Sequence, residues 1–212
     1  MNVELTWVTP NAEELIVKMA RVSAPKNQDN METAPKLLRY LIKHKHWSPF
    51  EMAGMCVEIE TTRAISPQIL RHRSFSFQEF SQRYADTAEL GSAVIPHLRR
   101  QDFKNRQNSI DDLSADAISG YYRRISKLYE DAEHLYREMV SSGIAKECAR
   151  SILPLSTQTR LFMNGTLRSW IHYLQLRCDP GTQFEHRQIA GKIKQIFCKE
   201  FPIIGEAAFA ED

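Results

Sequence analysis

The chain has 212 residues, of which 42% are hydrophobic and 25% charged, and its formal net charge is +2. These values are typical of a globular protein with one good core, so we expect a single domain over residues 1–212. A general nucleic-acid-binding protein would be more basic, and we expect no nucleic-acid partner. There is no signal-peptide pattern and no apolar run long enough to cross a bilayer. We therefore expect a cytoplasmic protein that makes no membrane contact.

The cysteines and histidines give no sign of a metal site. The four cysteines form no CxxC pair, and the seven histidines show no HExxH-type spacing. This pattern favours four reduced cysteines, with neither a zinc site nor a disulfide framework.

The apolar patterns predict few strands and many helices. Strands are expected at residues 3–9, 52–62 and 159–164. Helices are expected at residues 10–22, 33–45, 64–72, 113–142, 145–151, 166–177 and 182–200. We interpret Thr9 as the N-cap of the first helix, with Pro10 as its first residue, and Thr182 with Glu185 as a capping box.

The longest predicted helix is amphipathic. Its apolar residues recur at helical spacing, at positions 118, 121, 125, 128, 132, 135 and 139, and Gly143 follows as a C-terminal cap. We expect an α+β (mixed α/β) fold, in which a small central sheet is flanked by helices that include this one. No GxGxxG follows a strand, so a Rossmann nucleotide site is not expected.

The stretch RHRSFSFQEFSQRY, residues 71–84, mixes arginines, serines and amides with aromatic side chains. If residues 79–83 are extended, Glu79, Ser81 and Arg83 point to one side. Arginines bind phosphate in a bidentate manner and aromatic rings stack on heterocycles, so the pattern fits an anionic ligand that carries a ring. The alternative is an exposed turn with solvated ion pairs.

A second polar cluster lies on the helix expected at 166–177. Arg168 and His172 are four residues apart and share a face, whereas Arg177 points roughly the other way on a straight helix. Either the helix ends near residue 177, or a ligand site is built between subunits. His172 by itself also fits a hydrogen-bonded core histidine.

Taken together, these motifs resemble the flavin-dependent thymidylate synthases. The family signature R-H-R-x-x-S-x-N-x-x-S-x-R is matched at Arg71, His72, Arg73, Ser76, Ser81 and Arg83, and it departs at Gln78, where the family usually has asparagine. Other motifs match in the same order over about residues 20 to 190: Ala20 to Ser23, His46 to Glu51 (H-x-[ST]-P-F-E), Arg150 before Leu-Pro, and the late pattern that runs from Arg168 to Arg177.

The resemblance implies an enzyme that converts dUMP to dTMP, with 5,10-methylenetetrahydrofolate as carbon donor and NADPH as reductant through FAD. The family is homotetrameric with active sites shared between subunits, which would explain the opposed faces of Arg168 and Arg177. By position, the implied flavin-binding residues are His46, Ser48, Arg71, His72, Arg73, Glu79, Thr166, Leu167, Arg168 and His172. The implied dUMP-binding residues are Gln68, Ile69, Leu70, Arg71, Ser81, Gln82, Arg83, Arg150 and Arg177. Arg177 is the implied catalytic residue, because a fixed cation beside the pyrimidine stabilises negative charge on the ring.

Two other interpretations stay open from the residues alone. One is a non-enzymatic RNA- or DNA-binding module that uses the Arg/Phe stretch, against which the near-neutral net charge argues. The other is a flavoenzyme on the same scaffold with a different acceptor.

Overall fold

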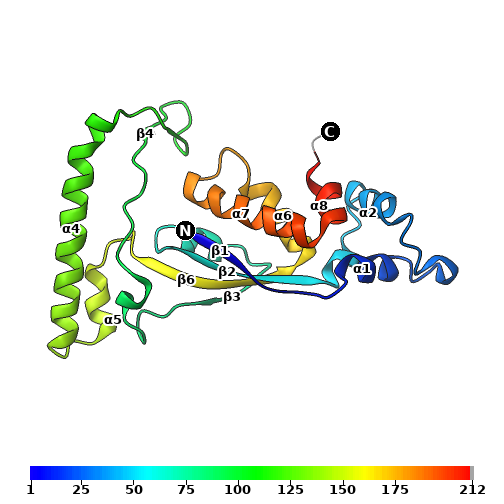
Figure 1. Ribbon diagram of the computed structural model, residues 1–212, viewed down its shortest axis with the longest axis horizontal. Helices are drawn as coiled ribbons and strands as arrows, with labels where there is room; N and C mark the ends of the chain where they lie inside the picture. The colour runs from blue at the N-terminus through cyan, green and yellow to red at the C-terminus, as the bar shows by residue number, and fades with distance from the viewer. Residues whose placement is uncertain (211–212) are drawn as a thin grey trace. The chain divides into compact units, whose positions relative to one another are not determined.

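The structure is a computed structural model that describes residues 1–210. Within these residues the fold is α+β, which confirms the predicted class (Figure 1). The strands are β1 (Asn2–Val8), β2 (Gly54–Thr62), β3 (Ser76–Glu79), β4 (Arg100–Gln101), β5 (Ser109–Ile110) and β6 (Gln158–Thr166). The α-helices are α1 (Ala12–Ala20), α2 (Ala34–Lys43), α3 (Ser66–Leu70), α4 (Ala115–Ser141), α5 (Lys146–Ala149), α6 (Leu167–Arg177), α7 (Phe184–Glu200) and α8 (Pro202–Phe209). The 3-10 helices are η1 (Pro25–Asn27), η2 (Ser48–Glu51), η3 (Thr87–Leu90) and η4 (Arg150–Ile152).

One sheet has the strand order β1-β2-β6-β3, and β4 pairs with β5 in an antiparallel ribbon. The described chain divides into two compact units. Unit 1 contains residues 60–70 and 78–161, and unit 2 contains residues 2–59, 71–77 and the chain from residue 162 onward. Strands β2, β3 and β6 contribute residues to both units.

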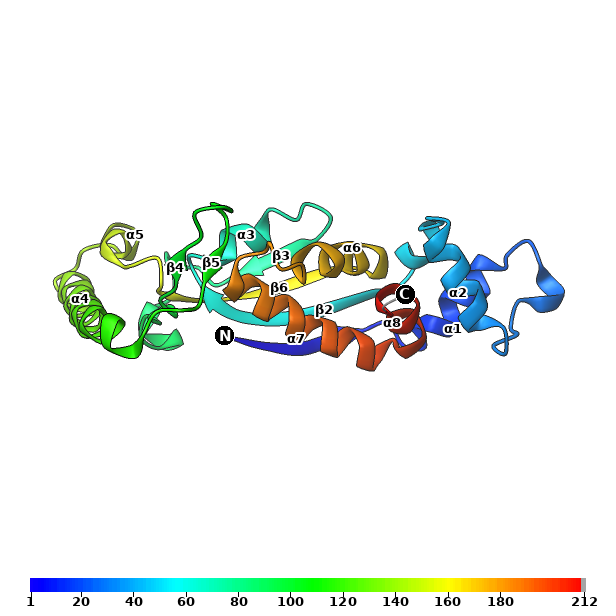
Figure 2. The same cartoon turned by 90° about the horizontal axis from the view of Figure 1, so that it is seen from above.

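Unit 2 holds the larger helical core. Helix α8 packs on α2 and α7, and α6 packs on α7 and η2 (Figure 2). The indole of Trp170, on α6, is fully buried and donates a hydrogen bond to the Met55 carbonyl of β2 over 2.9 Å. Gly165 lies so close to the Phe75 ring that an added Cβ would come within 2.5 Å of it. The chain therefore needs glycine here for residues 71–77 to pack against β6 and α6.

The late motif, which runs from Arg168 to Arg177, lies on α6 directly after the junction with β6. Along β6, Leu161 and Met163 are buried while Phe162 is exposed, the alternation expected of a strand with one covered face. Thr166 ends the strand and caps the helix, because its Oγ1 accepts a hydrogen bond from the Ser169 backbone N–H over 3.3 Å. The predicted helix over 166–177 is confirmed.

Unit 1 is dominated by α4, which confirms the long helix predicted over 113–142. Its N-cap is Ser114, whose hydroxyl accepts from the Ala117 N–H, and Gly143 follows its end with φ +86°. Tyr136 is its buried side chain, whereas Tyr121, Leu128 and Leu135 of the apolar stripe are exposed by 59%, 64% and 46%. Part of the apolar stripe of α4 is thus left uncovered by the described residues, while its other members are half-buried.

Two predicted helix starts are wrong. Helix α1 begins at Ala12 with Asn11 as N-cap, because the Thr9 hydroxyl accepts a hydrogen bond from the Gly54 N–H of β2 instead. Helix α7 begins at Phe184 without the capping box. The Thr182 hydroxyl donates to the Leu176 carbonyl, and Glu185 accepts from the Gln183 side chain.

The condition that residues 79–83 are extended is not met. Strand β3 ends at Glu79, and the backbone then turns, with the N–H groups of Tyr84 and Ala85 both donating to the Ser81 carbonyl. Ser81 and Arg83 therefore do not continue the side of the strand on which Glu79 lies.

Candidate active site

In unit 2, the last residue of α6 is anchored on the arginine-histidine motif. The Nε–H of Arg177 donates to Nε2 of His72 over 2.8 Å. Because Nε2 accepts, His72 is neutral and carries its proton on Nδ1. Burial, and secondarily the charge of Arg177, lower the pKa of His72 to about 4. Within residues 1–210, the terminal nitrogens of Arg177 make no hydrogen bond, so they can receive an acceptor from a ligand.

Tyr173 and His186 lie beneath this pair. The His72 ring meets the Tyr173 ring edge-on at 4.8 Å between centroids, and the buried Tyr173 hydroxyl lies 3.0 Å from Nε2 of His186. Burial raises the pKa of Tyr173, so the phenol keeps its proton and can donate. Burial first, then the charges of Arg177 and His72, lower the pKa of His186 to about 3.

On α6, the side chains of Arg168 and His172 contact residues 46–51. Arg168 pairs with Glu51, and the His172 ring stands edge-on to Trp47 at 4.6 Å. Desolvation, followed by the charge of Arg168, lowers the pKa of His172. His46 and Ser48, on the same segment, are exposed. His172 is likewise exposed, which removes the core-histidine alternative.

A hydrogen bond from the Ser169 hydroxyl to the Ser74 carbonyl, 3.2 Å long, ties the arginine-histidine loop to α6. Unit 2 thus brings together three motifs that are far apart in the sequence: residues 46–51, 71–74 and 166–177. Arg71 and Arg73 are exposed, and their side chains have no ion pair within the described chain. Two exposed guanidinium groups without an ion pair can bind the phosphate groups of a ligand.

Seven of the nine expected dUMP-binding residues belong to unit 1, which also contains a cavity of about 370 Å³. Gln82 and Arg150 line it, together with Arg63, Glu147, Ser151, Leu153, Pro154, Leu155 and Thr157. The buried Gln82 amide nitrogen has no hydrogen-bond partner in the described chain, and Arg150 has no ion pair there. A cavity of this size with an unpaired cation and an unsatisfied amide has the size and polar groups to fit a nucleoside monophosphate.

The other expected dUMP-binding residues of unit 1 do not line this cavity. Arg83 is exposed and pairs with Glu147 at 3.1 Å, while the Ser81 hydroxyl accepts from the Arg83 N–H. On α3, Ile69 is fully buried and belongs to the core, and Gln68 and Leu70 flank it in half-buried positions.

Glu79 is held by three donors within unit 1. Its Oε1 accepts from Ser66 over 2.5 Å and from Thr159 over 2.9 Å, and it pairs with Arg63 at 2.8 Å. This network fixes the end of β3 beside the cavity that Arg63 lines. Flavin contact by Glu79 stays a prediction.

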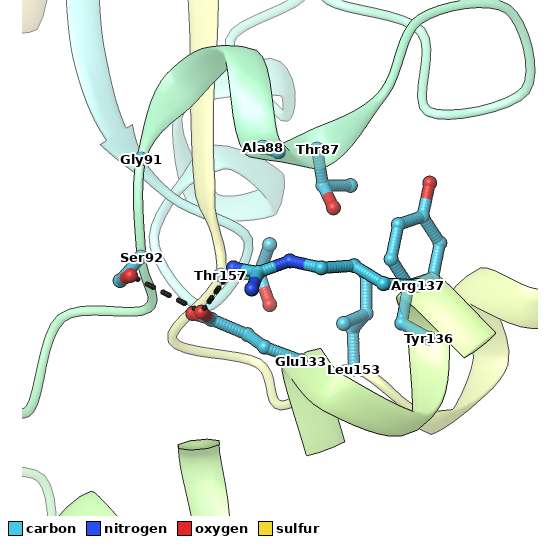
Figure 3. A pocket seen from close by; sticks show the side chains of 9 residues that line it. All are labelled: Thr87, Ala88, Gly91, Ser92, Glu133, Tyr136, Arg137, Leu153 and Thr157. Carbon is cyan, nitrogen blue, oxygen red and sulfur yellow. Dashed lines mark hydrogen bonds and ion pairs between the residues drawn. The ribbon is translucent and has the colours of Figure 1, made fainter. Parts of the chain in front are cut away.

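A smaller cavity of about 70 Å³ lies beside η3 and α4 in unit 1 (Figure 3). Glu133 accepts hydrogen bonds there from the Ser92 hydroxyl and from Arg137, while the buried Tyr136 hydroxyl lacks a partner in the described chain. The volume suits ordered water and is too small for a nucleotide. None of the predicted site residues lines it.

The described residues contain no cluster of three His, Cys, Asp or Glu side chains that could hold a metal ion. Among residues 1–210, no helix has both the length and the apolar character needed to span a bilayer.

Residues 4–203 match the family model described as "Thymidylate synthase complementing protein". The chain belongs to this family. It is 54% identical over 197 residues to a probable flavin-dependent thymidylate synthase of Paramecium bursaria Chlorella virus 1, covering 92% of this chain and 90% of that protein. It is 53% identical over 195 residues to the flavin-dependent thymidylate synthase of Synechocystis, covering 92% and 88%. The resemblance drawn from the motifs is confirmed.

The fold is similar to a crystal structure of a UMP/dUMP methylase from Streptomyces cacaoi bound with 5-Br dUMP. The TM-score is 0.86 at 29% sequence identity, over 97% of this chain and 93% of that one. The same enzyme bound with 5-Br UMP matches equally well, with a TM-score of 0.86 at 30% identity.

Proposed function

We propose that this chain is a flavin-dependent thymidylate synthase that methylates dUMP reductively to dTMP. It binds FAD, takes a methylene group from 5,10-methylenetetrahydrofolate and takes two electrons from NADPH. A methylene carbon needs two electrons to become a methyl group, so NADPH as reductant leaves the folate as tetrahydrofolate. The observation that carries the proposal is the Arg177 guanidinium, fixed through Nε on a neutral His72 in a chain of this family.

The flavin is assigned to the residues that the family motifs imply. Arg71 and Arg73 would hold its phosphates, and Ser48, Thr166 and Arg168 would supply further polar contacts. His46, His72, Glu79, Leu167 and His172 complete the set expected from the family motifs. When bound, the flavin carries electrons from NADPH to the transferred carbon.

The nucleotide is likewise assigned to the residues that the family motifs imply, among them Arg71 and Arg177. Arg150 and Arg83 would bind the phosphate, with Arg83 giving up its exposed pair with Glu147. Gln82 and Ser81 would place the nucleoside, and Gln68, Ile69 and Leu70 would form the edge of the site. Arg177 would stabilise negative charge that develops on the pyrimidine, as oxyanion-site donors do in other enzymes.

Residues 1–212 would form one domain of a homotetramer that acts in the cytoplasm and whose active sites are shared between subunits. The exposed Tyr121, Leu128 and Leu135 on α4 support burial of this helix against another copy. Sharing would also let Arg168 and Arg177 serve one active site from different chains.

Two measurements test the activity. The purified protein should be yellow, and its flavin absorption should bleach with NADPH when dUMP is present. With NADPH present, it should form dTMP only when both dUMP and methylenetetrahydrofolate are supplied. A colourless protein that FAD does not reconstitute would refute the proposal. Replacing dUMP with UMP tests whether this chain accepts both nucleotides, as the name of the UMP/dUMP methylase says of that enzyme.

A further inference from the structure

His186 was not among the candidates from the motifs, yet it lies directly beneath them. It is fully buried on α7, in the apolar stripe formed with Ile189, Ala190 and Ile193. A buried histidine amid such neighbours costs stability unless it is hydrogen-bonded. Its Nε2 lies 3.0 Å from the Tyr173 hydroxyl of α6, which is itself buried.

Tyr173 and Arg177 are four residues apart, so they occupy the same face of α6 one turn from each other. His72 contacts both. Its ring rests on the Tyr173 ring, with centroids 4.8 Å apart, and its Nε2 accepts from Arg177 over 2.8 Å. The place of Arg177 thus depends on His72, and the place of His72 depends on Tyr173.

The hydroxyl end of Tyr173 is fixed by His186, while the faces and edges of the ring are packed by aromatics. Trp170 and Phe75 each have their ring centroids 5.8 Å from that of Tyr173. These contacts are apolar and leave the hydroxyl to be satisfied by hydrogen bonding. The His186 imidazole is the hydrogen-bond partner of this hydroxyl.

We propose that His186 is a positioning residue for Arg177, acting through Tyr173 and His72. It holds the tyrosine ring at the depth at which His72 can present Nε2 to the guanidinium. This role rests on the proposed function, in which Arg177 binds the pyrimidine of dUMP. His186 does not touch the nucleotide, and its effect is carried by the hydrogen bond to Tyr173.

The test uses His186→Phe, which keeps a ring but removes the acceptor, and Tyr173→Phe, which removes the donor. Each FAD-loaded variant is titrated with dUMP, and the flavin absorption reports the Kd. Loss of one buried hydrogen bond should raise the Kd about tenfold in either variant. The double variant should be no weaker than the weaker single variant, because both changes remove the same bond. His186→Gln, whose amide can accept at the Nε2 position, should bind dUMP within about twofold of wild type.

Ile193→Val on α7 is the matched control, because it removes one buried methylene equivalent and leaves the hydrogen bond intact. It should lower Tm without changing the Kd for dUMP. If His186→Phe and Tyr173→Phe also lower Tm but bind dUMP as wild type does, the bond only joins α6 to α7, and the positioning role is overturned. Formation of dTMP by wild type in the same preparation shows that this failure leaves the proposed function standing. A wild type that does not bind dUMP overturns both.

Discussion

The side chains of Arg177 and His72, 105 positions apart in the sequence, share one hydrogen bond from Nε to Nε2 over 2.8 Å. The bond uses the one N–H of the guanidinium that is not on a terminal nitrogen, so the planar end of Arg177 remains available. It also requires His72 to be neutral, because a protonated imidazole has no acceptor.

This relationship predicts a pH dependence of stability. The pKa values of His72 and His186 are lowered to about 4 and about 3, below the value of about 6.5 expected in the unfolded chain. Between these pKa values, the two histidines are more protonated in the unfolded state than in the folded state. Their contribution to stability is therefore complete above about pH 6.5 and is lost as pH falls toward about 4. Tm should therefore fall when pH is lowered from about 7.5 to about 5. Calorimetry on His186→Phe should show a smaller fall, and an equal fall would contradict the assignment for His186.

Arg168→Ala should weaken FAD retention with little change in Tm. The Arg168–Glu51 pair is 43% and 44% exposed, and exposed pairs contribute about 0–1 kcal/mol. The FAD-to-protein ratio after gel filtration measures the effect. The Arg160–Glu60 pair is exposed by 44% and 43%, so Arg160→Ala is a matched control that should keep its flavin. Equal flavin content in the two variants would remove Arg168 from the flavin site.

Replacing α4 apolar residues should disrupt the tetramer. Leu128→Glu places a charge on the exposed apolar stripe and should reduce the mass measured by light scattering, whereas Lys127→Ala on the polar side should not. A wild-type monomer that holds stoichiometric FAD would contradict the shared site.

None of the four cysteines should act as a nucleophile. Burial raises the pKa of Cys56, Cys178 and Cys198, which lowers the thiolate fraction at neutral pH. Each Cys→Ala variant should turn over within a few-fold of wild type. Deleting a catalytic nucleophile typically lowers turnover by roughly a thousandfold or more. Such a loss of turnover in one variant, with FAD and dUMP still bound, would contradict this prediction.

The sequence predicts the long elements and the motifs because these depend on local periodicity and on residue type. Helix α4 and strand β6 follow their apolar patterns closely. The two wrong helix starts arise where the expected capping hydroxyl bonds to a group outside the helix. Thr9 bonds to Gly54 rather than capping α1, and Thr182 bonds to Leu176 rather than capping α7.

Helix α8 was not among the predicted helices. It begins at Pro202, and proline is favoured in the first turn of a helix. His186 was missed because its neighbours on α7 have the spacing of an ordinary core face. The signal that could have found it is the polar residue within that apolar stripe. Its pairing with Tyr173 arises from the packing of α6 on α7, which the sequence pattern does not reveal.

The most direct test of the role of Arg177 is to measure dTMP formation by Arg177→Ala with dUMP, methylenetetrahydrofolate and NADPH. If Arg177 stabilises charge on the pyrimidine, kcat/KM should fall by roughly 10²–10³, or about 3–4 kcal/mol, with FAD still bound and the fold intact. If Arg177 only stabilises the C-terminal dipole of α6, worth about 0.3–1 kcal/mol, the variant would melt slightly earlier and still make dTMP. Near-normal turnover in Arg177→Ala would contradict the central assignment.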